Sequence, residues 1–282
     1  MASITKVWNI NRDGFPNITS KKFTKVSVGF EWEIENPWEP SDCNCDNDYD
    51  EFCPCCDEEY SEAEPNVSSL TDSFTDTHGF RTHYECGGTE FASPVFRNLG
   101  TARAMASRIK AVAGADSLLY PKETNGCGIH VHTGFSGWDF RDARFNKDYR
   151  TVTSMLNRAS STPFILVFSG RSSTHDYFKQ ARSTGWDIGS VSGAPSEGQL
   201  DWMRHVEMVR PNRFDGKSTI EYRIWNGTED RLQPAIDFAH ACTTFITKRK
   251  ANSIPYLKEF KAWVDKQAGY KVLKQDPAWS LI

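Results

Sequence analysis

Basic residues are missing from one long stretch of this 282-residue sequence. Between Val26 and Phe80 there is no lysine or arginine, whereas sixteen of the 37 acidic residues fall there. The rest of the chain holds all 33 basic residues against 21 acidic ones, a balance of +12. This excess of basic residues suits a polyanionic ligand such as a nucleotide or a nucleic acid, although an ordinary solvated surface gives the same pattern.

Long apolar segments are missing as well. The longest uninterrupted apolar runs are short, as in PFILVF at 163–168, and none approaches the roughly 20 residues that a membrane-spanning helix needs. The first residues also lack the basic and apolar regions of a secretory signal. These absences predict a cytoplasmic protein that makes no membrane contact.

A regular pattern of apolar residues is absent from residues 36–77, where prolines, acids and cysteines are concentrated. A segment of this length is too long for an idle connection between two elements, so we interpret it as an insertion. The apolar content of the whole chain, 38%, is ordinary for a globular protein. Because no internal repeat is found either, we predict a single domain over 1–282 that carries this Cys-rich acidic insertion.

Five of the eight cysteines crowd into CNCDNDYDEFCPCC, within the insertion. A disulfide scaffold is usually a short secreted chain, so thiols this close together in a reducing compartment most often hold a metal. Two C-x-C pairs favour a tetrahedral, structural Zn²⁺ site, the alternative being free thiols in an acidic loop. The candidate ligands are Cys43, Cys45, Cys53 and Cys55, with Cys56 competing with Cys55.

Outside the insertion, strand and helix patterns follow one another along the chain. Strands are predicted at 24–35, on both sides of a turn at Gly87 and Gly88, at 128–135, at 204–209 and at 218–225. Helices are predicted from the N-cap Asn98 to the C-cap Gly114, up to a point near Ala159, at 232–249 and at 256–267. Together these elements predict an α+β fold, with an antiparallel sheet and helices packed on one side.

Three glutamates alternate along the first predicted strand. Successive side chains of a strand point to opposite faces, and we assign one face to the core. The core face carries Phe30, Trp32 and Ile34, and the opposite face carries Glu31, Glu33 and Glu35. Neighbouring carboxylates repel one another unless a cation or an arginine neutralises them, so this row is either a cation site or the exposed polar face of an edge strand.

Two histidines lie one residue apart in NGCGIHVHTG, residues 125–134. Ile129 and Val131 fit the core, so His130 and His132 point together to the other face, where the flanking glycines leave open space. A lone histidine is more often a structural residue, but a pair on one face favours a functional role. Metal binding, phosphate binding and acid–base catalysis all fit such a pair.

A third strand of this kind is predicted in STIEYRIWNGTED, where Glu221, Arg223 and Trp225 share a face. By themselves Glu221 and Arg223 could form no more than a lateral ion pair. Glu85 and Glu90 lie on either side of the turn at 87–88. Several separate strands thus offer carboxylates or imidazoles, and an oxygen-rich site with few nitrogens suits Mg²⁺ or Mn²⁺ better than Zn²⁺.

Four motifs resemble, in their order, those of the glutamine synthetase-like carboxylate-amine ligases, and most closely the amidoligase family of bacteria, fungi and phages. The motifs are GFEWEIE, GGTEFASP, NGCGIHVH and TIEYRIWNGT, spread from residue 29 to 228. NGCGIHVH is similar to the Asn-Gly-Ser-Gly-x-His-x-His stretch of glutamine synthetases, and IEYR to their Ile-Glu-x-Arg strand. The resemblance implies a curved, mainly antiparallel sheet of the glutamine synthetase type, and the host cytoplasm as location if the chain is of phage origin.

The resemblance also implies roles for the matching residues. Glu31 and Glu33 occupy the first-strand metal positions, one for each of two divalent cations. Further metal ligands are matched by Glu85, Glu90, His130 and Glu221, with Glu85 and Glu90 closer together in sequence than in glutamine synthetase. His132 resembles a histidine nearer the substrate, and Arg223 an arginine that contacts the transferred phosphate. Candidates for binding ATP phosphates or the substrate carboxylate are Arg171 and Arg210.

An ATP-dependent ligase is the function that this resemblance implies. A carboxylate attacks the γ-phosphate of ATP to give an acyl phosphate, and an amine then displaces phosphate to leave an amide. Two Mg²⁺ or Mn²⁺ ions and a guanidinium would meet the negative charge of the transferred phosphoryl group. The substrates would be small-molecule or peptide carboxylates and amines, and an oligomer is one option because glutamine synthetases place active sites between subunits.

Other functions fit the same residues. A metal-dependent hydrolase or nuclease would use these carboxylates and histidines without ATP. A zinc-stabilised, non-enzymatic protein would bind nucleic acid through its basic body, a partner that we consider but do not favour. A thiol nucleophile at Cys127, beside His130, is a further and weaker alternative.

Overall fold

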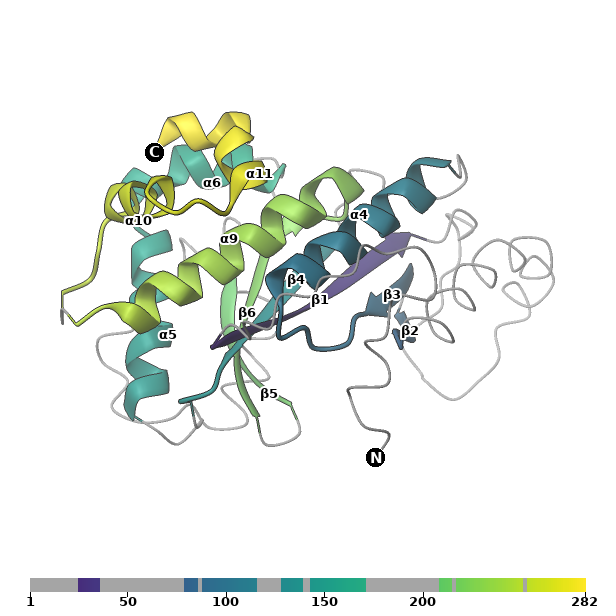
Figure 1. Ribbon diagram of the computed structural model, residues 1–282, viewed down its shortest axis with the longest axis horizontal. Coiled ribbons are helices and arrows are strands. Elements are labelled where there is room, and N and C mark those ends of the chain that lie inside the picture. The colour runs from purple at the N-terminus through teal and green to yellow at the C-terminus, as the bar shows by residue number, and fades with distance from the viewer. Residues whose placement is uncertain are drawn as a thin grey trace, which may run out of the picture.

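The computed structural model describes residues 25–35, 79–85, 88–115, 128–138, 143–170, 208–214, 217–250 and 253–282. Within these ranges, six strands form one sheet in the order β2-β3-β1-β4-β6-β5, and every neighbouring pair is antiparallel (Figure 1). The strands are β1 (Val26–Glu35), β2 (Arg81–Glu85), β3 (Gly88–Ala92), β4 (Gly128–Phe135), β5 (Val209–Phe214) and β6 (Lys217–Asn226).

Most helices of the described ranges pack against this sheet, and the last two pack against the long helix α9 (Glu229–Lys248). They are α4 (Leu99–Ala115), α5 (Ala143–Leu156), α6 (Thr162–Ser169), α9 (Glu229–Lys248), α10 (Leu257–Asp265) and α11 (Lys271–Gln275), with 3₁₀ turns at Ala159–Ser161 and Pro277–Leu281. The two long helices α4 and α9 run side by side across one face of the sheet (Figure 1). The prediction of an α+β fold with an antiparallel sheet is therefore confirmed. None of the described helices is long and apolar enough to cross a membrane.

The core lies between the sheet and α9, as strand alternation requires. Phe30 and Trp32 of β1 and Ile129 and Val131 of β4 are all at most 1% exposed, and α9 packs over β1, β4 and β6. The Nε1 of Trp32 donates a hydrogen bond of 2.8 Å to a backbone oxygen beyond the end of β6, so this large ring is buried without an unsatisfied polar atom. The opposite faces of β1 and β4 are thereby left for the glutamates and histidines.

A β-bulge in β6 overturns one sequence prediction. Trp225 is paired with Ile129 and Tyr222 with Val131, so two residues of β6, Arg223 and Ile224, stand opposite the single residue between them on β4. The extra residue reverses the alternation beyond it. Trp225 is consequently fully buried on the helical side, against Phe168 and Phe238, and does not share a face with Arg223.

Element boundaries differ from the prediction at several places. Helix α4 continues through Gly114, and α5 ends at Leu156 rather than near Ala159. The predicted strand at 204–209 overlaps β5 only at Val209, because β5 continues to Phe214 through Pro211. Proline is tolerated there since β5 is an edge strand. The insertion at 36–77 lies outside the described residues.

Replacing Asn98 by alanine should weaken the start of α4. The Asn98 side-chain oxygen accepts a hydrogen bond of 2.8 Å from the backbone N–H of Gly100, as expected of an N-cap. Its loss should lower the free energy of unfolding by about 1 kcal/mol, measured by urea denaturation. Asn98→Ser, which restores an accepting oxygen, should recover most of that stability, and equal losses in both variants would contradict the capping role.

Candidate functional site

The face of the sheet opposite α9 carries charged side chains in register. Glu31 of β1 lies directly opposite His130 of β4, and His132 lies directly opposite Glu221 of β6. Arg210 of the edge strand β5 is in turn the partner of Glu221. Directly opposed residues of an antiparallel pair point to the same face, so register alone delivers these five groups to one place.

His130 joins two neighbouring strands through both of its ring nitrogens. The Nε of Arg223 donates a hydrogen bond of 3.1 Å to Nε2 of His130. Because Nε2 accepts, the ring hydrogen is on Nδ1, which lies 3.2 Å from Oε2 of Glu31 and donates to it. The His130 side chain is only 6% exposed, so its position is fixed by these contacts.

Glu221 is the most deeply buried charge of the site. Its side chain is fully buried, and its Oε2 accepts a hydrogen bond of 2.5 Å from Nε of Arg210. Its Oε1 lies 3.6 Å from Nε of Arg223 and 3.8 Å from Nδ1 of His130. A carboxylate with such neighbours is ionised even without contact with water.

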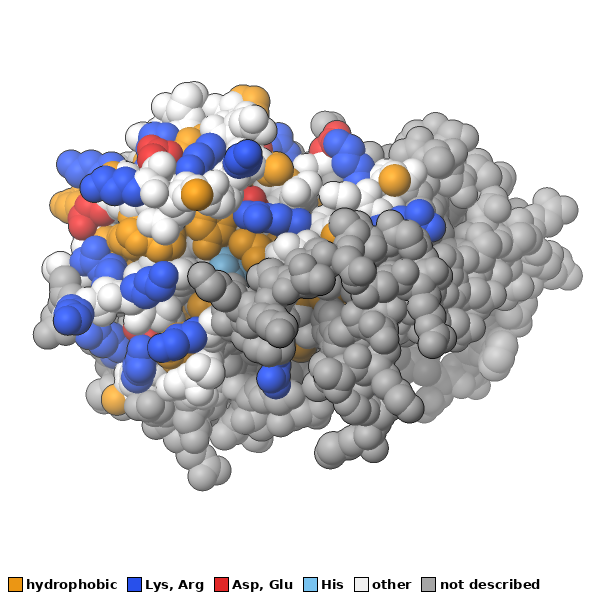
Figure 2. Space-filling model, viewed as in Figure 1, with side chains coloured by type: hydrophobic (Ala, Val, Ile, Leu, Met, Phe, Trp, Pro, Cys, Tyr) orange, Lys and Arg blue, Asp and Glu red, His pale blue; other side chains and the backbone are white. Residues whose placement is uncertain are grey.

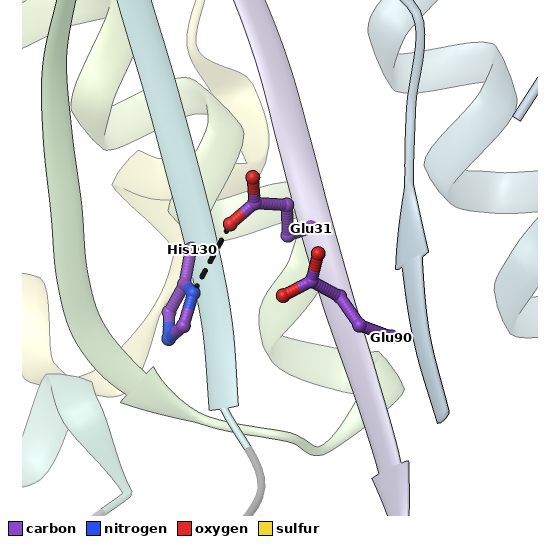
Figure 3. A group of neighbouring side chains, drawn as sticks. All are labelled: Glu31, Glu90 and His130. Carbon is purple, nitrogen blue, oxygen red and sulfur yellow. Dashed lines mark hydrogen bonds and ion pairs between the residues drawn. The ribbon is translucent and has the colours of Figure 1, made fainter. Parts of the chain in front are cut away.

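Two further glutamates border His130. Glu90 of β3 lies directly opposite Glu33 of β1 in the β1–β3 ladder. The carboxylate of Glu90 points toward Glu31 and His130 (Figure 3). Glu33 accepts a hydrogen bond of 2.6 Å from the backbone N–H of Gly128, and its Oε1 lies 3.6 Å from Nε2 of His130. The backbone at the start of β4 thus orients one of the acidic side chains.

The charges of the site hold several groups in their ionised forms. Burial alone would raise the pKa of the Glu31 carboxyl, but the charge of His132 and the hydrogen bond from His130 hold this pKa well below its usual value. Burial also opposes the lowered pKa of Glu221, which results from the charges of His132 and Arg210. Although burial disfavours imidazolium, Glu31 and Glu221 raise the pKa of His132 to about 9.

Two overlapping sets of side chains have the spacing of cation ligands. Glu31, Glu90 and His130 form one set, and Glu31, His132 and Glu221 form the other; within each set the ligand atoms lie within 4.8 Å of one another. Glu31 belongs to both sets. Such a mixture of carboxylate oxygens with one imidazole per set matches the preference of Mg²⁺ or Mn²⁺.

The second set also contains a proton that a cation would replace. Nε2 of His132 is buried and lies 3.0 Å from Oε1 of Glu31, with which the protonated imidazole forms an ion pair. Once deprotonated, the same nitrogen would offer its lone pair to a cation that Glu31 and Glu221 also hold. Two carboxylates and one imidazole whose ligand atoms lie this close together therefore fit a divalent ion.

The structure brings together most of the residues that the sequence singled out. The group on this face comprises Glu31, Glu33, Glu90, His130, His132, Arg210, Glu221 and Arg223. Glu85 lies in β2, but its side chain is outside the description, as are Arg171, Cys127 and the candidate zinc ligands Cys43, Cys45, Cys53, Cys55 and Cys56.

His132 lies at a candidate metal-ligand position, one of the roles that the pattern left open for the two histidines, and not at the substrate position that the resemblance implied. The resemblance placed it near the substrate, whereas its Nε2 here lies among the atoms of the second ligand set. The alternation of His130 and His132 already put both imidazoles on one face. Alternation along β4 does not contain the register with β6, and this register puts Glu221 directly opposite His132.

Comparison with known proteins gives little beyond this geometry. No known protein family and no curated protein sequence matches the chain. Among solved structures, a ligand-free form of GmaS is similar, with a TM-score of 0.45 and 13% sequence identity. The match covers 91% of this chain and 66% of that chain.

Proposed function

We propose that this protein is an ATP-dependent carboxylate-amine ligase that forms an amide through an acyl phosphate, with two divalent cations. The observation that carries the proposal is the pair of ligand sets that share Glu31, with Arg210 and Arg223 at their border. Two adjacent cations and two guanidinium groups are what the charge of a transferred phosphoryl group requires. The order of the sequence motifs, which resembles that of the glutamine synthetase-like ligases, supports the same reaction.

The chain's own side chains divide this work. Glu31, Glu90 and His130 would hold one cation, and Glu31, His132 and Glu221 the other. When bound, the two cations would neutralise phosphate oxygens and align the γ-phosphate with the attacking carboxylate.

Arg210 and Arg223 would contact the phosphate groups directly. Arg210 and Arg223 have side chains that are 16% and 15% exposed, so their guanidinium groups are largely shielded from water while still reachable from it. Shielded charges act more strongly on a nearby phosphate than exposed ones. Arg223, which follows Glu221 on the same strand, is the group that we place beside the transferred phosphate.

The distribution of basic side chains supports nucleic-acid binding less well than the ligand sets support a ligase. On the side of the molecule that α4 and α9 cover, lysine and arginine side chains are scattered among apolar and neutral ones (Figure 2). Nucleic-acid-binding proteins typically gather such side chains in a stripe or on one face. On this face the described basic side chains form no such stripe, so nucleic-acid binding is the second candidate and an outcome to test.

Release of ADP and phosphate that depends on an added amine tests the ligase proposal. Purified protein with ATP and Mg²⁺ should release both products when an amino acid and an amine from a panel are supplied together. Without the amine, release should fall to a small fraction, because the acyl phosphate is not consumed. Mass spectrometry should detect the amide.

The alternative functions give different results in the same assay. Metal-dependent cleavage of a nucleic acid or an ester without ATP would favour the hydrolase and contradict the ligase. Salt-sensitive nucleic-acid binding that survives Glu33→Ala, with no ATP turnover, would favour a binding protein.

A further inference from the structure

The two arginines of the site are bound to residues that a cation would need. Nε of Arg210 donates to Oε2 of Glu221, and Nε of Arg223 donates to Nε2 of His130. His130 belongs to one candidate ligand set and Glu221 to the other. In this structure one residue of each ligand set therefore accepts a hydrogen bond from an arginine.

This arrangement is built into the sheet. Arg210 is the direct partner of Glu221 across the β5–β6 ladder. Arg223 stands at the bulge of β6, where β6 has two residues opposite the single position of His130 on β4. The strand register thus places both arginines beside the ligand residues.

A cation and a guanidinium would compete for the same two side chains, His130 and Glu221. Neutral imidazole has one acceptor nitrogen, and in His130 Arg223 already uses it. A cation can bind Nε2 of neutral His130 only if Arg223 leaves it, and it can bind Nδ1 only if the ring hydrogen moves to Nε2, to which Arg223 could then no longer donate. At Glu221 the bound guanidinium and a divalent ion would be like charges on one buried carboxylate, and their repulsion is little screened there.

We propose that Arg210 and Arg223 are internal counter-cations of the cation-free site, which divalent cations displace and which then bind the phosphate groups of a polyphosphate. The identity of that polyphosphate, ATP, rests on the proposed function. Displacement makes cation binding and polyphosphate binding favour each other, since a guanidinium that has left its ligand residue can donate to phosphate oxygens instead. This coupling is reciprocal by thermodynamic necessity.

Cation titration without nucleotide tests the proposal directly. Isothermal titration calorimetry of the full chain with Mn²⁺ alone should give a lower Kd for Arg210→Gln than for the wild type, by on the order of tenfold. With Mn²⁺ saturating, the same variant should bind a non-hydrolysable ATP analogue about tenfold more weakly. Arg223→Gln should show the same pair of opposite effects, and it serves in place of Arg210→Gln if that variant does not fold.

Two controls separate displacement from a general charge effect. Arg144→Gln removes the same charge from a side chain that is 47% exposed and that contacts Asp148 of its own helix and the backbone oxygen of Thr247 on α9, so its Mn²⁺ affinity should stay that of the wild type. In roughly 0.5 M KCl the Debye length is only about 4 Å, which suppresses long-range effects but not a direct contact. The tighter Mn²⁺ binding of Arg210→Gln should therefore persist in high salt, and its disappearance would overturn the proposal.

The outcomes distinguish this proposal from the proposed function. Unchanged or weaker Mn²⁺ binding in both arginine variants would mean that the arginines only orient the ligands, and would overturn the counter-cation role even in an active ligase. Tighter Mn²⁺ binding without any affinity for the ATP analogue would support the counter-cation role and contradict the ligase. Absence of Mn²⁺ binding in the wild type and in both variants would overturn both.

Discussion

Replacing Glu31 by glutamine is expected to abolish binding of both cations and to lower turnover by on the order of 10³-fold or more, since a single lost contact to transition-state charge commonly costs 10²–10³-fold. Glu31 is the residue that the two ligand sets share. Glutamine keeps the shape of the side chain but removes the charge and one acceptor oxygen. Mn²⁺ titration and the amine-dependent ATPase assay measure the two effects.

The fold should survive this substitution. The lowered pKa of Glu31 means that its charge is net stabilising, so Glu31→Gln should lower the free energy of unfolding somewhat, but the buried apolar residues on the other face of β1 are unchanged. Glu259→Gln, which changes the net charge equally at an exposed site on α10, is the matched control and should keep full activity. A Glu31→Gln protein that is folded and still binds two cations would rule out the shared-ligand arrangement.

Cation binding to the second ligand set should become tighter with rising pH. The pKa of His132 is raised to about 9, whereas those of Glu31 and Glu221 are lowered, so near pH 7 the carboxylates are ionised and His132 carries a proton. A cation must displace that proton from Nε2. The apparent Kd for Mn²⁺ should therefore fall about tenfold per pH unit from pH 6.5 to 8.5, roughly 100-fold in all.

The same shifts predict the opposite trend for stability without a cation. A raised histidine pKa contributes stability that is complete below the unfolded pKa of 6.5 and is lost as the pH rises through about 9. The lowered carboxylate pKa values contribute stability that is lost only in acid. His132→Gln should remove the alkaline loss in thermal denaturation and the steep pH dependence of Mn²⁺ binding. A pH dependence unchanged in His132→Gln would contradict a ligand role for His132.

Alternation along single strands was enough to predict which side chains of β1 and β4 face the site. Glu31 and His130 point to one face of the sheet and their buried neighbours Trp32 and Ile129 to the other, as the sequence positions require. The sequence does not contain the register between strands, which depends on packing of residues about a hundred positions apart. That register is what pairs Glu31 with His130 and His132 with Glu221.

The sequence predictions that differ from the structure do so for local physical reasons. Trp225 was assigned to the wrong face because a bulge adds a residue to β6, and no turn residue in RIWN indicates one. Helix α6 was not assigned because PFILVF is apolar throughout and so has no helical period to detect. The Asn98 cap, in contrast, is a local signal and gave the start of α4 correctly.

The wide spacing of the site along the chain has a consequence for how the protein acquires its chemistry. Glu31 and His130 are 99 residues apart, and His130 and Arg223 are 93 apart. Pairings over such separations form slowly, because long loops must close first. A chain in which β6 has not yet docked has neither Glu221 nor its arginines in place. The gain of Mn²⁺ affinity during refolding should thus report completion of the sheet, as a signal separate from the formation of the helices.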